Sequence, residues 1–119
     1  MKNKEDTLGY DFEDLDVHIN SDYVLKNRLR TSKKLSWTLL WVVKTYDSTK
    51  KNRFLIKDLA EVMHCQQNQA RDYIETLKKY SVLRLSPYTE GKAKIYTLNV
   101  DDSRHLKFIK IAKKALGLK

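Results

Sequence analysis

A short run of amide side chains and one arginine lies near the middle of the chain. Its polar members are Gln66, Gln67, Asn68, Gln69 and Arg71. In a helix, spacings of three and four place Gln67, Asn68 and Arg71 on one face. Amide side chains can form paired hydrogen bonds with adenine, and arginine can do so with guanine, so these residues suit contacts with base edges. The other interpretation is that an amide-rich helix start is simply solvated.

Basic residues follow in a segment with the composition of a β-hairpin. The runs 82–86 and 94–98 are strand-like, and the turn signal 87–91 between them ends in Gly91, which can adopt a positive φ. Lys92 and Lys94 lie two apart on the predicted second strand, so both are expected on the same face. The candidate phosphate or minor-groove contacts are Arg84, Lys92 and Lys94. Ordinary exposed strand charge is the other interpretation of each.

The remaining reactive residues form no recognisable catalytic or metal-binding pattern. His64 lies beside Cys65, but only His18 and His105 remain to complete a zinc site, and each is isolated in the sequence. Cys65 occupies an apolar position of its segment, which is typical of a buried structural thiol. The helical carboxylates suit surface ion pairs. We therefore expect no enzyme activity, no metal, no cofactor and no small-molecule substrate.

These side chains must be positioned by a chain that is mainly α with a small β-hairpin. The helix predicted over 67–80 buries Ala70, Ile74 and Leu77 at spacings of four and three. The other predicted elements are a strand over 14–20, a helix from Ser21 or Asp22 to about Leu29, a long helix capped by Thr31 or Ser32, a polar loop over 48–52, a short strand over 54–56, a helix over 57–63 and a C-terminal helix over 102–116 that Gly117 can stop.

The long helix is too apolar to have a single narrow buried stripe. Its apolar residues are Leu35, Trp37, Leu39, Leu40, Trp41, Val42, Val43 and Tyr46. We expect burial on two sides, one against the domain core and the other against a partner subunit or the terminal helices. In the last helix, the expected apolar side comprises Leu106, Phe108, Ile109, Ile111, Ala112, Ala115 and Leu116.

The predicted elements follow an order that resembles a known family, namely a long helix followed by helix, turn, helix and hairpin. Residues 59–83, LAEVMHCQQNQARDYIETLKKYSVL, resemble the DNA-binding core of the MarR-like winged helix-turn-helix superfamily, with Ala60 at a close helix approach and Val62 or Met63 and Cys65 buried. Residues 92–98, KAKIYTL, are similar to the second wing strand of that superfamily and of plasmid centromere-binding proteins. Two positions depart from the pattern. His64 replaces the usual Gly of the turn, and Gln66 replaces the usual Ser or Thr of the cap.

Composition sets the domain count and the class of partner. With 119 residues and a net charge of +9, the chain fits one domain that binds a polyanion. Residues 1–24 hold two Lys against seven Asp or Glu, net −5, which leaves +14 on the remainder. We expect a flexible acidic tail over 1–13 and one domain over 14–119 with its core at 33–100. Basicity alone also fits a membrane surface or ribosomal RNA.

The sequence thus predicts a winged helix-turn-helix protein with additional N- and C-terminal helices that binds double-stranded DNA sequence-specifically as a homodimer. The biological role would be transcriptional repression, or replication, segregation or conjugative transfer of a plasmid or phage. The alternative is a protein-interaction adaptor in such a complex. A lone cysteine, the lack of a signal peptide and the lack of a membrane span predict a cytoplasmic protein that does not engage a membrane.

Overall fold

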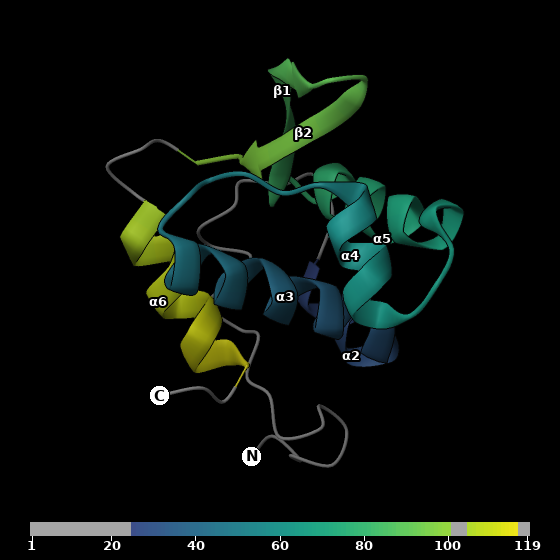
Figure 1. Ribbon diagram of the computed structural model, residues 1–119. Coiled ribbons are helices and arrows are strands. Elements are labelled where there is room, and N and C mark those ends of the chain that lie inside the picture. Colours follow the sequence, from purple (N-terminus) through teal and green to yellow (C-terminus); the bar gives the residue numbers. More distant parts are fainter. Residues whose placement is uncertain (1–24, 101–104, 117–119) are drawn as a thin grey trace, which may run out of the picture.

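The computed structural model describes residues 25–100 and 105–116 and is mainly helical with one antiparallel hairpin (Figure 1). The elements in chain order are α2 (Leu25–Thr31), α3 (Lys33–Thr49), α4 (Ile56–Met63), α5 (Gln67–Lys79), β1 (Leu83–Glu90), β2 (Ala93–Leu98) and α6 (His105–Ala115). The predicted tail over 1–13, the predicted strand over 14–20 and the predicted helix starts at residues 21–22 and 102 lie outside the described residues, as does Gly117.

The central helix is α3, and a capping residue defines each of its ends. Ser32 is its N-cap and accepts a hydrogen bond from the Leu35 backbone nitrogen at 3.2 Å, which confirms the predicted capping position. Lys50 closes the helix in the left-handed region. The predicted two-sided burial is confirmed in part, because the terminal helices α2 and α6 pack on α3 together with α5. Trp37, however, remains half exposed.

The C-terminal helix α6 packs along α3 through an apolar face. Phe108, Ile109 and Ala112 are buried there, but Leu106 is 71 % exposed, so its predicted place in the apolar stripe is wrong. Leu106 lies two residues before Phe108 and therefore on the other side of the helix, so packing through Phe108 leaves Leu106 on the outer side. At the other end, Lys113 pairs with Asp47 of α3 at 3.2 Å, and this hydrogen bond is the main cause that lowers the pKa of Asp47.

Helices α4 and α5 are joined by a tight turn around His64. His64 has φ 53° and ψ 46°, and the Cys65 backbone nitrogen donates to the Ala60 carbonyl at 3.0 Å. This is the hydrogen-bond pattern of a Schellman helix end, for which glycine is the usual residue because it lacks a Cβ. His64 therefore performs the role of the glycine that the resemblance implied. Met63 rather than Val62 faces the core, since Val62 is 59 % exposed.

The hairpin is longer than the sequence suggested. The predicted turn at 87–91 is wrong in its extent, because residues 87–90 complete β1 and the chain reverses at Gly91 and Lys92. The register shifts between Leu85 and Thr89, where β1 carries extra residues opposite β2. Pro87 lies in this irregular stretch, where its missing N–H costs no ladder hydrogen bond. Gly91 has the predicted positive φ, 61°.

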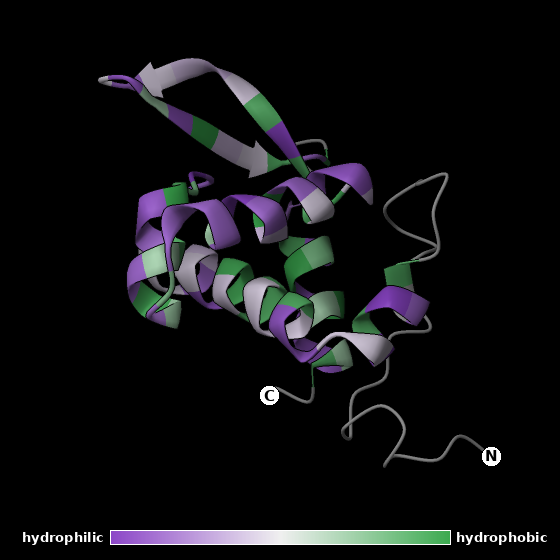
Figure 2. Cartoon of the chain, turned by 90° about the vertical axis from the view of Figure 1, so that its right-hand side faces the viewer, coloured by the Kyte–Doolittle hydropathy of each residue, from purple (hydrophilic) through white to green (hydrophobic). Residues whose placement is uncertain are grey.

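The loop before α4 connects the hairpin with the helices. Phe54 exchanges backbone hydrogen bonds with Tyr96 of β2, both at 2.9 Å, so the predicted strand over 54–56 is reduced to a single bridge. It cannot extend further because Ile56 already begins α4. Phe54 is buried and its ring contacts Trp41 edge to face at 5.7 Å. Hydrophobic faces of the helices turn inward, whereas the turn of the hairpin is hydrophilic (Figure 2).

Candidate nucleic-acid interface

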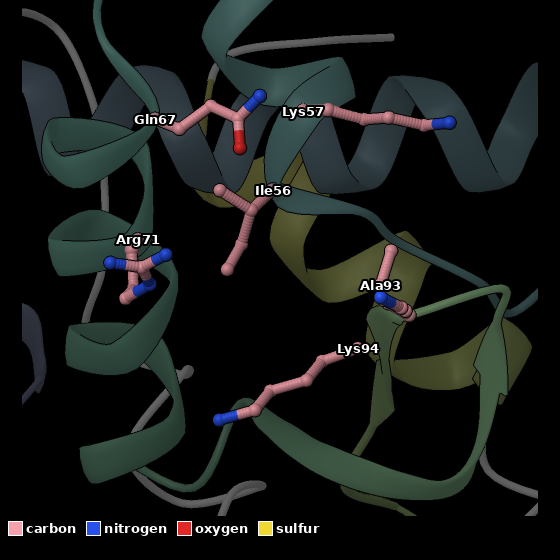
Figure 3. Close-up of a pocket in the computed structure, with 7 residues that line it drawn as sticks. Ile56, Lys57, Gln67, Arg71, Ala93 and Lys94 are labelled. Carbon is pink, nitrogen blue, oxygen red and sulfur yellow. The ribbon is translucent and has the colours of Figure 1, made fainter.

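A surface groove of about 360 Å³ lies between the start of α4, the first turns of α5 and the hairpin (Figure 3). We call it the basic groove, and its lining residues are Ile56, Lys57, Gln67, Arg71, Lys92, Ala93 and Lys94. Four of these seven residues carry a positive charge. The groove is thus a concave surface suited to an anion.

Helix α5 supplies one wall of the basic groove. Gln67 and Arg71 lie one turn apart and are exposed, while Ala70, Ile74 and Leu77 are buried against the body of the protein. The 3.6-residue period explains this division, because burial of one face leaves the other to solvent. The predicted helix and its predicted buried face are therefore confirmed.

The hairpin supplies the opposite wall. Lys94 lies in β2 and its ammonium group points across the groove towards α5 (Figure 3). Lys92 lies in the turn beside Gly91 rather than on the strand, so strand alternation does not determine its direction as predicted. Both lysines nevertheless line the groove and are exposed.

A hydrogen bond holds the hairpin against α5. The Tyr96 hydroxyl donates to Oε2 of Glu75 at 2.5 Å, and Tyr96 is buried. Burial is the largest cause that raises the pKa of Tyr96 to about 12, followed by the Glu75 carboxylate, while Arg71 acts in the opposite direction. Tyr96 lies two residues from Lys94 on β2, so both side chains project from the face of the hairpin that meets α5.

Not every predicted residue lies in the basic groove. Arg84 lies opposite Thr97, and cross-strand partners share a face of the hairpin. Thr97 is three residues after Lys94, so Arg84 and Thr97 project from the face opposite that of Lys94. Asn68 is exposed on α5 but does not line the groove. The Gln69 side-chain oxygen accepts from the backbone nitrogen of Gln66 at 3.4 Å, so this amide stabilises the start of α5.

Sequence reasoning missed the contribution of α4. Lys57 and Ile56 line the basic groove from the first turn of this helix. The N-cap Leu55 provides no side-chain acceptor to the free N–H groups of that turn, whose partial positive charge adds to the groove. The sequence did contain one signal for this site, because Lys57 is the first residue of the predicted helix over 57–63. A single lysine at a helix start is common, however, and does not by itself indicate a binding site.

No carboxylate is among the residues that line the basic groove, and the neighbouring Glu90 is engaged in ion pairs. It pairs with Arg53 of the loop before α4 and, at 3.5 Å, with Lys57. Across the part of the chain that the structure describes, no three His, Cys, Asp or Glu side chains gather where they could hold a metal ion. The basic groove therefore offers cations and an amide, a set suited to binding a polyanion.

A second groove, of about 310 Å³, lies between α3 and the end of α4. We call it the apolar groove, and it is lined by Trp37, Leu40, Trp41, Lys44, Val62 and Met63. Trp37 and Val62 are both half exposed or more. Large exposed apolar side chains that gather in one place are typical of a surface that contacts another protein.

The chain matches no protein-family model, and none of the curated proteins is significantly similar to it. Within residues 25–100 and 105–116, no helix has the length and apolar character that crossing a membrane requires.

Proposed function

We propose that this protein binds double-stranded DNA sequence-specifically and that its fold is a winged helix-turn-helix. In this proposal α4 and α5 are the helix-turn-helix, α5 is the recognition helix and the hairpin is the wing. The observation that carries the proposal is the basic groove, where Gln67 and Arg71 of α5 face Lys92 and Lys94 of the hairpin.

The two walls of the groove have different tasks on a duplex. The exposed start of α5 enters the major groove, where Gln67, Asn68 and Arg71 reach base edges. The lysines of the hairpin contact phosphates beside it and fix the orientation of the protein without reading sequence. The 360 Å³ of space between the walls is where the sugar-phosphate backbone passes.

We further propose that the protein acts as a homodimer on a repeated or palindromic site. In this proposal the second copy covers the apolar groove, where Trp37 is half exposed although α2 and α6 pack on other parts of α3. Transcriptional repression, or replication, segregation or transfer of a plasmid or phage, are the processes that such a module serves.

The experiment is a salt titration of duplex binding by the Lys92→Ala, Lys94→Ala double variant. Each lost phosphate contact reduces the slope of log affinity against log salt by about one, so we expect a decrease of about two. The loss should be nearly uniform across DNA sequences. Lys107→Ala with Lys110→Ala is the matched control, since both lysines are exposed on α6 outside the groove. An unchanged slope in the groove variant would remove these lysines from the interface.

A second candidate function is that of a protein-interaction adaptor. The apolar groove favours it, because Trp37 and Val62 offer large exposed apolar surfaces. An adaptor should show no tight duplex binding even at low salt, whereas DNA binding by several cations must strengthen steeply as salt falls. Fluorescence anisotropy of a labelled duplex at decreasing salt separates the two functions.

A further inference from the structure

The hairpin end of the basic groove contains an ion-pair cluster that joins three segments of the chain. Glu90, the last residue of β1, pairs with Arg53 from the loop before α4 and with Lys57 from the first turn of α4. Lys57 itself lines the basic groove, and so does Ala93, the register partner of Glu90. The cluster is therefore continuous with the groove.

From this geometry we infer that Arg53 and Lys57 form a phosphate-binding subsite, which the Glu90 carboxylate occupies in the free protein and a DNA phosphate takes over in the complex. The inference rests on the proposed function and adds a specific site to it. Carboxylate and phosphate oxygens both accept charge-assisted hydrogen bonds from guanidinium and ammonium groups, so a phosphate can bind where the Glu90 carboxylate binds.

The exposure of the three side chains makes this exchange accessible. Side-chain exposure is 40 % for Arg53, 55 % for Lys57 and 42 % for Glu90, so each is within reach of a ligand without unfolding. Exposed ion pairs of this kind are weak, because water screens them and ordering long side chains costs entropy. A phosphate that carries its own counterions can therefore displace the carboxylate and release those ions.

The position of the subsite also fits the path of a DNA strand. A strand that contacts Lys92 and Lys94 presents a phosphate about every 3.4 Å along the helix axis, so neighbouring phosphates pass the adjoining end of the groove. The first turn of α4 contributes its N–H groups at the same place, since Lys57 is the second residue of that helix. Arg53, Lys57 and this helix end then act on one phosphate.

The test is Glu90→Gln, which keeps the shape of the side chain and removes its charge. We expect this variant to bind a duplex about three- to tenfold more tightly at moderate salt, because two exposed ion pairs no longer have to be broken. Glu61→Gln is the matched control, since Glu61 is an exposed carboxylate of α4 outside the groove. Equal tightening in both variants would show a general charge effect and overturn the inference.

Alanine substitutions of the cations test the subsite directly. In the Glu90→Gln background, Arg53→Ala and Lys57→Ala should each reduce the salt slope by about one. If Glu90 serves only to fasten the hairpin, Glu90→Gln will lower the melting temperature without tightening binding, and Arg53→Ala will leave the slope unchanged. If the unaltered protein binds the duplex but Glu90→Gln does not tighten binding and Arg53→Ala does not change the slope, the inferred subsite is wrong and the proposed function stands. If no form binds, both fail.

Discussion

Amide side chains that look equivalent in the sequence have different roles at the start of α5. Gln69 turns back to accept a hydrogen bond from the Gln66 backbone, so it helps to begin the helix. Gln67, two residues earlier, lines the basic groove. The difference arises because backbone N–H groups at a helix start have no partner within the helix. A side chain at the third helical position, that of Gln69, can reach back to the N-cap residue, whereas that of Gln67 at the first position cannot.

At the residue scale, Arg71→Ala tests direct base recognition. Arg71 lines the basic groove from α5, and losing its paired hydrogen bonds to a base should weaken specific binding by about 1 to 3 kcal/mol. Preference should relax at one base pair, which selection of bound duplexes from a random pool would reveal. Arg28→Ala is the control, because Arg28 is an exposed arginine on α2 outside the groove. An equal loss on specific and random duplexes would assign Arg71 to a phosphate instead.

At the element scale, the attachment of the hairpin to α5 is the feature that builds the groove. The hairpin contacts the body through the Phe54 bridge and through the hydrogen bond from Tyr96 to Glu75. An isolated two-stranded hairpin is only marginally stable in water, so these attachments stabilise it. Because Lys94 and Tyr96 share a face of β2, the attachment also fixes the wall of the groove.

Tyr96→Phe tests this attachment through its pH dependence. The folded protein keeps the Tyr96 proton up to a pKa of about 12, whereas an unfolded tyrosine loses it near the ordinary value of 10. The contribution to stability is therefore complete below pH 10 and is lost as pH rises towards 12. The difference in unfolding free energy between the natural protein and Tyr96→Phe should shrink by about 2 kcal/mol between pH 9 and pH 11.5.

Urea unfolding at pH 9 and at pH 11.5 measures this change, and subtracting the two proteins cancels the titration of the other tyrosines and the lysines. A difference that stays constant between the two pH values would show that Tyr96 is not held in its neutral form. Tyr88→Phe is a control, because Tyr88 is an exposed tyrosine of the same hairpin.

At the scale of the whole molecule, charge is distributed unevenly along the chain. Residues 1–24 carry −5 and the remainder carries +14. Deleting residues 1–13, which include Glu5, Asp6 and Asp11, should therefore strengthen non-specific DNA binding while the protein still unfolds cooperatively. Binding to a random duplex and thermal unfolding measure the two effects.

The deletion removes four acidic residues and two lysines, so it raises the net charge by two. The double variant Asp6→Asn, Asp11→Asn is the matched control, because it raises the net charge equally without shortening the chain. If the double variant strengthens non-specific binding as the deletion does, charge is the cause. Loss of cooperative unfolding in the deletion alone would show that residues 1–13 contribute to the fold.

The sequence by itself determined the helices within residues 33–100, the presence of one hairpin and the type of surface they carry. Ala70, Ile74 and Leu77 recur at the helical period, so the buried and exposed faces of α5 followed from spacing alone. The Ser32 cap and the positive φ of Gly91 were also predictable, because each depends on the chemistry of a few neighbouring residues.

Tertiary structure alone decided which charges meet. The pairing register put Arg84 and Lys94 on opposite faces of the hairpin, and the irregular stretch of β1 moved the turn to Gly91 and Lys92. Lys57 and Glu90 are 33 positions apart in the sequence and lie together only because the hairpin folds back onto α4. Such contacts depend on register and packing between distant segments, and a one-residue change in register reverses the face of every side chain in a strand.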